Sequence, residues 1–300
     1  MKEDHSSHEE FHNDVESMCQ WLESMNIGID KNRVAQYRKT SRIIAEHIRK
    51  GTVKELEKSL GFPKQTDTVH DVSELILIHQ QLNDYDCPVF KTTLAQAVNG
   101  PTSLAEERPQ SSDARNKVFE LVIAAQLKAA GFRPKFVEPA DAIVTIEGIK
   151  CYVECKRIQS ENSLEENIQK ASSQIKERLN QEASTKPRGL IAIDISKAIN
   201  TDGTLYFTAR SSDDLTKVIE FNLAQFLKRN RAKLTKDIHS RISAVLVYLR
   251  TPAVIEYQGG LLTNFRRLFA IASIWNDGTN KNIFQKLQKR LFEAEKNIFK

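Results

Sequence analysis

Residues 141–157 constrain the fold more than any other part of this chain. Two β-rich runs, AIVTI and IKCYVEC, flank Glu147-Gly148 there. A two-residue link that ends in glycine between two such runs predicts a tight β-hairpin. If these two residues form the turn, the pairing runs back along both strands until Asp141 lies opposite Glu154.

The predicted hairpin has two chemically different faces, because strand side chains alternate. One face is wholly apolar and should be core: Ala142, Val144, Ile146, Ile149, Cys151, Val153 and Cys155. The other face carries Asp141, Glu154 and Lys156. Opposed residues have Cβ atoms roughly 5 Å apart, so two carboxylates would repel unless a positive group lies between them. A hard divalent cation with oxygen ligands is the natural candidate, and Lys156 adds a third functional group.

Composition indicates a soluble globular protein. The chain has 300 residues, 40% hydrophobic and 28% charged, which allows one large or two modest domains. It has no apolar run as long as a membrane span and no hydrophobic signal region at its N-terminus. We therefore expect an intracellular, cytoplasmic protein with no membrane partner. Four cysteines without a C-x-x-C pair predict reduced, structural thiols.

Charge is unevenly distributed along the chain. Residues 1–110 hold 13 Lys and Arg against 18 Asp and Glu, whereas residues 111–300 hold 31 against 21. The basic excess therefore lies in the part that contains the hairpin. Such a balance suits a polyanionic partner, although a charge excess is more often an ordinary solvated face.

The pattern of elements changes near residue 110. Apolar residues repeat at helical spacing through the first hundred residues, and a polar, proline-containing stretch from Glu106 to Asp113 follows. We predict a helical N-terminal region over 1–110, for docking or regulation and with no assigned chemistry, and a second domain over 111–300.

The second domain is predicted to be α/β. A helix over 113–130, a strand over 133–137, the hairpin, a helix over 163–179 and a strand over 189–196 give the order helix, three strands, helix, strand. The strand–helix–strand step predicts parallel strands. Further strands are expected over 205–208, 242–249 and 268–275, with helices over 214–229 and 282–299.

Glu120 is the one charge inside the apolar block of the 113–130 helix. An unpaired buried carboxylate is too costly to keep, so Glu120 needs a partner. Taken alone, the helix favours a structural ion pair with Arg115 or Lys117. The alternative is a metal shared with the hairpin.

This order of elements and acids resembles the PD-(D/E)XK nuclease superfamily, which has the restriction-endonuclease-like fold with an αβββαβ core and a mixed sheet. The matching residues are Pro139-Ala140-Asp141, then Glu154-Cys155-Lys156, with Glu120 as the helix acid. Ala140 separates the proline from the aspartate, a departure from the literal motif. The resemblance covers about residues 113–196.

The resemblance implies a metal-dependent mechanism. Asp141, Glu154 and the backbone carbonyl of Cys155 would bind Mg²⁺ or Mn²⁺, with Glu120 helping directly or through water. Lys156 would orient the attacking water or stabilise charge in the transition state.

Two further residues are candidates for positioning the substrate. These are Tyr152 on the site face and Gln174 on the following helix. A packing or surface role is the more common one for each.

The expected function is a Mg²⁺-dependent nuclease, a DNA endonuclease rather than an RNase, in a bacterial defence or restriction context. The alternative is a nucleic-acid-binding or assembly subunit in which cleavage is absent or depends on a partner. Its N-terminal helices would then dock a protein partner, and a homo-oligomer is also possible. A hydrolase of small phosphate compounds has no support, because no P-loop, G-x-S-x-G or zinc-ligand spacing occurs.

Overall fold

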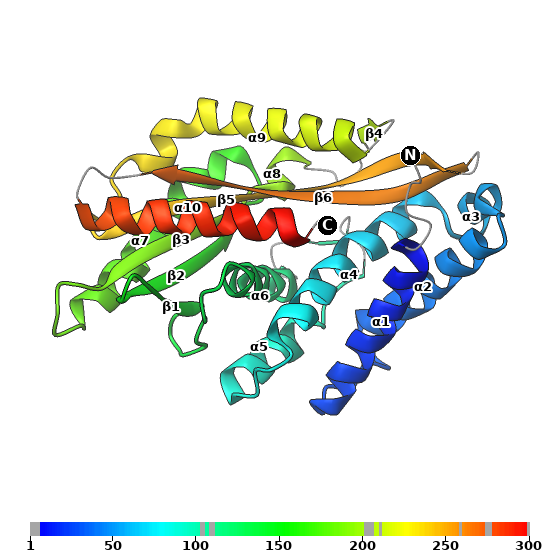
Figure 1. Cartoon of the computed structure of the whole chain (residues 1–300), viewed down its shortest axis with the longest axis horizontal. Coiled ribbons are helices and arrows are strands. Elements are labelled where there is room, and N and C mark those ends of the chain that lie inside the picture. The colour runs from blue at the N-terminus through cyan, green and yellow to red at the C-terminus, as the bar shows by residue number, and fades with distance from the viewer. Residues whose placement is uncertain are drawn as a thin grey trace.

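A computed structural model describes residues 7–102, 106–107, 112–200, 207–209, 212–257, 260–273 and 278–298. It confirms the predicted fold class, because a helical N-terminal region precedes a mixed sheet with interspersed helices (Figure 1). None of the described helices combines the length and the apolar character needed to cross a lipid bilayer.

The N-terminal region is helical, as predicted, and lies at one end of the molecule (Figure 1). Its helices are α1 (Ser7–Ser24), α2 (Arg33–Arg49), α3 (Val53–Leu60), α4 (Phe62–Leu82) and α5 (Pro88–Ala97). Local chemistry sets several of their starts. The Asn32 side chain caps α2 by accepting a hydrogen bond from the Val34 N–H at 2.9 Å. Pro88 begins α5, where its missing N–H costs no hydrogen bond.

Six strands in the described part of the chain form one mixed sheet. They are β1 (Ala142–Ile146), β2 (Ile149–Arg157), β3 (Arg188–Asp194), β4 (Phe207–Ala209), β5 (Ile242–Tyr257) and β6 (Gly260–Ser273). The order is β1-β2-β3-β5-β4, and β6 pairs with β5. β2, β3 and β5 run parallel, as predicted for the strand–helix–strand step, while β1 and β6 are antiparallel to their neighbours.

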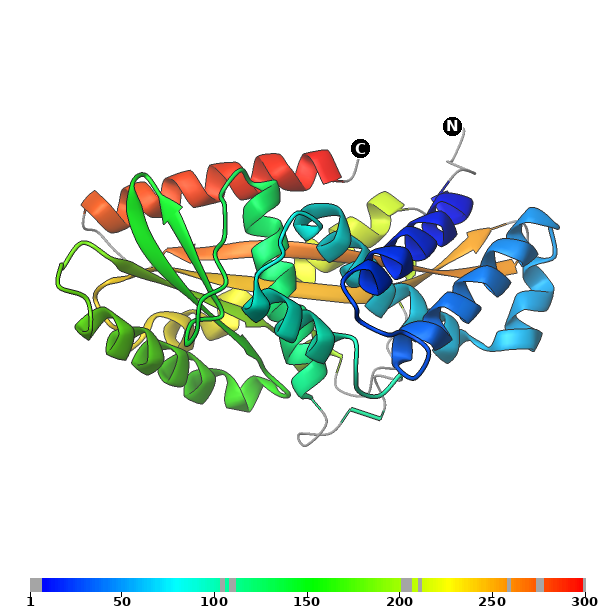
Figure 2. The same cartoon turned by 90° about the horizontal axis from the view of Figure 1, so that it is seen from below.

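Helices cover both faces of the sheet (Figures 1 and 2). They are α6 (Asp113–Ala129), the 3₁₀ turn η2 (Glu161–Ser163), α7 (Leu164–Asn180), α8 (Ser196–Ile199), α9 (Ser212–Thr235) and α10 (Gly278–Ile298). β5 separates two cores, because its side chains alternate. Ala244, Leu246 and Tyr248 join the core with α6, α10 and the N-terminal helices. Val245 and Val247 join the core with α7 and α9.

One core crosses the predicted boundary near residue 110. It contains buried side chains of α1, α4 and α5 as well as those of α6, the hairpin and β5. β5 and β6 also extend past the other strands to reach the N-terminal helices, where Leu262 of β6 packs with Ile44, Leu56 and Val69. The two predicted parts of the chain are therefore neighbours across a shared interior.

The predicted strand over 133–137 is replaced by a single bridge. The Lys135 N–H donates to the Ile143 carbonyl at 2.7 Å, and the Ile143 N–H donates back at 2.9 Å. Pro134 and Pro139 flank this segment and lack the N–H that a longer ladder needs. Two strands, rather than the three of the predicted αβββαβ core, therefore lie between α6 and α7.

Candidate functional site

The hairpin has the predicted register. Pairs run from Ala142 with Val153 to Ile146 with Ile149. Glu147 has a φ of 50° and the following glycine a φ of 73°. Positive φ at both turn positions is the geometry of a type I′ turn, whose twist matches that of the flanking strands.

The two faces of the hairpin also match the prediction. The apolar face is buried in the core on the α6 side, with only Ile149 partly exposed. The other face is the side from which Glu154 and Lys156 project. The residue just before β1 is Asp141, so the register brings its carboxylate to the end of β2 that carries this acid and this lysine.

Asp141 is anchored to β2 by a hydrogen bond. Its Oδ2 atom accepts from the backbone N–H of Cys155 at 2.7 Å. Burial and then the charge of Glu154 raise the pKa of the Asp141 carboxyl to about 6. The charge of Glu154 therefore acts on the carboxyl that the hairpin predicts as its neighbour.

Glu154 is the most buried acid of this group, with 2% of its side chain exposed. Its Oε1 atom accepts from Lys156 Nζ at 2.7 Å. Its Oε2 atom accepts from Arg178 on α7, and this guanidinium also donates to the Pro139 carbonyl. Arg178 thus ties α7 to the acid and to the loop before Asp141, a role that the sequence analysis missed.

Glu120 reaches the same site from α6. Lys117 Nζ donates to both of its carboxylate oxygens at 2.9 Å, so the structural ion pair expected from the helix alone is present. Burial and then the charge of Asp141 raise the pKa of Glu120 to about 7, Lys117 lowers it, and Glu154 adds a further rise. The structural pairing and the shared site therefore coexist.

The three acids surround Cys155 on β2. Burial, and then the charges of Asp141, Glu120 and Glu154, raise the pKa of its thiol well above the ordinary value. This thiol is therefore a buried structural group, as predicted. The role of the Cys155 backbone carbonyl as a metal ligand stays a prediction.

The donor set suits Mg²⁺ or Mn²⁺ in kind, because three carboxylates supply only hard oxygen ligands. The raised pKa values of Glu120 and Asp141 show that the nearby cations only partly offset the cost of their charge. The described residues, however, contain no group of three or more His, Cys, Asp or Glu side chains gathered closely enough to hold a metal. Lys156 and Arg178 occupy both oxygens of Glu154, so this acid has to exchange partners to become a ligand.

The two predicted positioning residues differ in their surroundings. Tyr152 donates to Glu182, and Lys150 Nζ lies 4.8 Å from the centre of its ring, so Tyr152 is already engaged. Gln174 lies one helical turn before Arg178 on α7, and its Oε1 atom is buried without a hydrogen-bond partner among the described residues. Gln174 therefore has an acceptor that is not committed to the fold.

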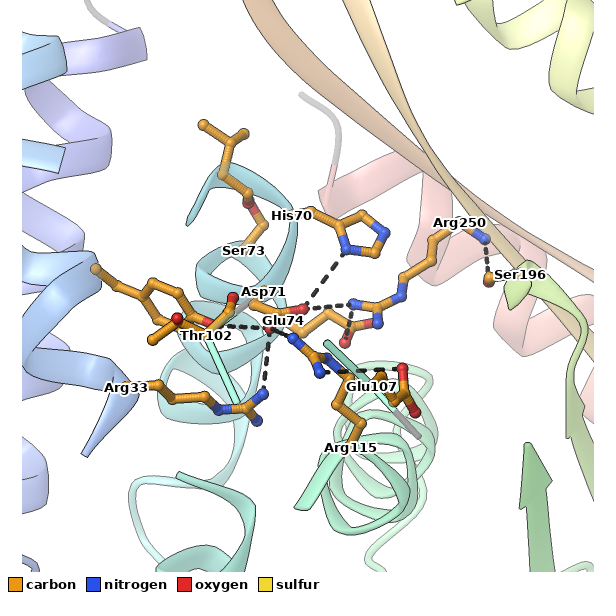
Figure 3. Close-up of polar contacts among 12 residues, drawn as sticks. Arg33, His70, Asp71, Ser73, Glu74, Thr102, Glu107, Arg115, Ser196 and Arg250 are labelled. Carbon is orange, nitrogen blue, oxygen red and sulfur yellow. Dashed lines mark hydrogen bonds and ion pairs between the residues drawn. The ribbon is translucent and has the colours of Figure 1, made fainter. Parts of the chain in front are cut away.

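The N-terminal region, to which the sequence analysis assigned no chemistry, holds a buried network of charges centred on Asp71 of α4 (Figure 3). Its Oδ2 atom accepts from Tyr37 at 2.7 Å, from Arg115 at 2.9 Å and from Arg33 at 3.2 Å. Burial acts to raise the pKa of Asp71, but Arg115 and the other nearby cations hold it well below the ordinary value.

The same network continues to the sheet. Glu74 of α4 pairs with Arg250 of β5 and accepts from the Tyr248 hydroxyl at 2.7 Å. At the end of β2, Arg157 donates to Glu107 at 2.6 Å and to Asp194 at 3.0 Å. Arg157, the residue next to Lys156, therefore ties the end of β2 to the segment before α6 and to β3. The sequence signal for this network was the presence of charged residues on helix faces that are otherwise apolar.

No protein-family model, curated protein or solved structure matches this chain. Functional assignment rests on the residues of the site.

Proposed function

We propose that this protein is a metal-dependent nuclease that hydrolyses phosphodiester bonds, with DNA as the preferred substrate. The observation that carries the proposal is the convergence of Glu120 of α6, Asp141 just before β1 and Glu154 of β2, close enough to raise the pKa of two of them. Buried acids with perturbed pKa values that lie beside one another are candidates for a functional site. The PD-(D/E)XK resemblance of the sequence supports the same proposal.

After Glu154 exchanges its contacts with Lys156 and Arg178 and the acids draw closer, the three acids would hold a Mg²⁺ or Mn²⁺ ion, with the Cys155 carbonyl as a further oxygen ligand. When bound, such an ion supplies Lewis-acid activation of a phosphodiester oxygen and of a water molecule. The anchoring of Asp141 to the Cys155 N–H fixes one ligand before the substrate arrives.

Two lysines border the acids and have separate tasks. Lys156, whose side chain is 17% exposed, can turn from Glu154 toward a phosphate oxygen or the attacking water. Lys117 is one-third exposed and stays beside Glu120 at the other side of the site. Positive charge at both sides favours a substrate that carries negative charge along its length. The basic balance of residues 111–300 agrees with such a substrate.

Purified protein incubated with supercoiled plasmid, linear duplex and single strands tests the proposal. We expect cleavage with Mg²⁺ or Mn²⁺, none with EDTA, and none with Asp141→Ala or Lys156→Ala. Glu166→Gln, which removes an exposed carboxylate at the start of α7, is the matched control and should cut like the wild type. Metal-dependent cutting that survives both substitutions at the site would overturn the proposal.

A second function is favoured by one specific observation. Glu154 is paired on both oxygens, and Arg178 and Lys156 would both have to move for metal to bind. A nucleic-acid-binding subunit that keeps the fold without turnover would retain this closed arrangement. Binding to DNA without cleavage in any metal, with affinity unchanged in Asp141→Ala, would favour this function.

A further inference from the structure

A second pocket lies beyond the end of β2, and none of the three acids lines it. It is lined by His70 of α4, Arg157 of β2, Ser196, Lys197 and Asn200 in and after α8, and Arg250 and Pro252 of β5. Lys156 pairs with Glu154, while the next residue, Arg157, lines this pocket. The pocket is therefore a separate site beside the candidate nuclease site.

The pocket has the position at which open α/β sheets take their ligands. Arg157 is the last residue of β2, and Ser196 and Lys197 follow directly after β3, which runs parallel to it. Ligands of such sheets bind in the crevice outside the carboxyl ends of the parallel strands. Here His70 of α4, a helix of the N-terminal region, lines the crevice opposite Arg250 of β5 (Figure 3).

The lining is basic and has no carboxylate among its residues. Arg157 and Arg250 are each paired with acids that do not line the pocket. Lys197 makes no ion pair with the described residues and is only partly buried. A cation would meet four basic side chains here, whereas an anion would meet charge of the opposite sign.

Two of the lining side chains are buried, and one of them has an N–H group without an acceptor in the described part of the chain. His70 is 3% exposed, and its Nδ1 atom faces the Asp71 carboxylate at 3.6 Å (Figure 3). Arg250 is 4% exposed, and its Nε–H has no acceptor among the described residues. Buried donors are normally satisfied, so the unpaired Nε–H of Arg250, a side chain that lines the pocket, favours an acceptor that enters from outside.

The size of the pocket limits what can enter. Its cavity volume is about 20 Å³, and one water needs roughly 10–15 Å³ on this measure. That space admits the oxygens of one small group and excludes a nucleobase or a sugar ring. Hydroxyl and amide groups at Ser196 and Asn200 extend the polar lining.

We propose that this pocket binds a phosphate-type oxyanion, either as free phosphate or as the terminal phosphate of a nucleotide whose remainder stays outside. The bound oxyanion would link α4 to the ends of β2 and β5, and so would tighten the contact between the N-terminal helices and the sheet. This site does not depend on the proposed nuclease function.

Thermal unfolding and calorimetry of the full chain test the proposal, with inorganic phosphate, AMP and ATP titrated at constant ionic strength against chloride. We expect saturable binding and a rise in melting temperature that chloride does not give. Lys197→Gln should weaken binding at least tenfold, because Lys197 has no other ion pair to preserve. Lys236→Gln, at an exposed lysine after α9, is the matched control and should bind like the wild type.

The arms of the experiment separate the two sources of the oxyanion. Tighter binding of ATP or AMP than of phosphate identifies a nucleotide, and binding of phosphate alone identifies the free ion. His70→Gln provides a second variant, which should weaken binding while the acids of the nuclease site remain intact. A melting temperature that responds equally to phosphate and chloride, or affinity unchanged in both pocket variants, would overturn the proposal.

Discussion

The carboxylate of Asp141 accepts a hydrogen bond from the backbone N–H of Cys155 at 2.7 Å, just beyond Ala142–Val153, the last ladder pair of the hairpin. The bond holds an acid that precedes β1 against the strand that carries Glu154 and Lys156. The backbone fixes the direction of this hydrogen bond, so the orientation of the Asp141 carboxylate does not depend on the neighbouring side chains.

Asp141→Asn should separate charge from geometry. The amide oxygen of asparagine can still accept from the Cys155 N–H, while the negative charge is lost. We expect metal-dependent cleavage to fall about 100-fold or more, the size of effect seen when one charge-stabilising group is removed from an active site. A plasmid-nicking assay measures the loss, and a melting temperature at or above that of the wild type shows that the fold is intact. Cleavage within threefold of wild type would contradict the role of Asp141.

Glu120→Gln should stabilise the metal-free protein. The pKa of Glu120 is raised to about 7, so its contribution to stability is full below the unfolded pKa near 4.5 and is lost as the pH rises through 7. Each pKa unit corresponds to about 1.4 kcal/mol, and the loss of the ion pair with Lys117 offsets part of the gain. At pH 7.5 we therefore expect the substitution to raise the free energy of unfolding by about 1–2 kcal/mol.

Urea unfolding in EDTA at pH 5, 6 and 7.5 measures this effect. The wild type should lose stability across the range, and Glu120→Gln should lose less. Glu177→Gln, at an exposed position on α7, is the matched control and should follow the wild type. Equal pH dependence in wild type and Glu120→Gln would contradict the argument. Stabilisation together with lost activity is the signature of a strained functional site.

Arg178→Met should destabilise the fold. Arg178 and Glu154 have side chains that are 8% and 2% exposed, and removing one member of such a buried pair leaves a buried charge with less compensation. We expect a loss of about 3 kcal/mol in the free energy of unfolding, measured with urea. Arg229→Met removes an exposed arginine that pairs with Glu161, so it should cost less than about 1 kcal/mol. Similar losses in the two variants would contradict the structural role of Arg178.

The features that the sequence predicts correctly are local ones. The hairpin register follows from the alternation of side chains and from two turn residues, so it needs no information about the rest of the fold. The pairing of Lys117 with Glu120 is equally local, because residues three apart share a helix face. The parallel arrangement of β2 and β3 follows from the helical connection between them, which is long enough for a right-handed crossover.

The features that it misses depend on contacts distant in sequence. Arg178 reaches Glu154 across 24 residues, and Arg115 reaches Asp71 across 44. No periodicity specifies which arginine meets which acid, because several pairings satisfy the same charge balance. Around Lys135 the sequence predicts a strand that is not formed. Strand propensity favours a strand there, but the flanking prolines limit the pairing to one bridge.

Acid should unfold the protein through the network around Asp71. Arg115 and its neighbours hold the pKa of Asp71 well below its ordinary value, and arginines also lower those of Glu107 and Asp194. A depressed carboxyl pKa stabilises the fold above the unfolded pKa near 4 and loses this effect as the pH falls through the folded value. Burial lowers the pKa of His70, which adds a smaller loss below pH 6.5.

Circular dichroism during thermal unfolding from pH 7 to pH 3 measures this dependence. We expect the melting temperature to fall steeply below about pH 4.5. His70→Gln should remove only the shallower part of the decline between pH 6.5 and 5. A melting temperature at pH 3 that equals the value at pH 6 would show that these acids do not hold the N-terminal helices against the sheet.

Gly148→Ala should destabilise the hairpin through the backbone alone. Gly148 has a φ of 73°, and a Cβ added there would meet no atom within 4 Å, so no steric clash contributes. An alanine in this left-handed conformation costs about 1 kcal/mol. Gly28→Ala is the matched control, because Gly28 has equally open surroundings without a positive φ, and it should leave stability nearly unchanged. Urea unfolding of the two variants compares them directly. Equal stability of both would mean that the turn does not need its left-handed backbone, and would remove the type I′ geometry as the device that sets Asp141 beside Glu154.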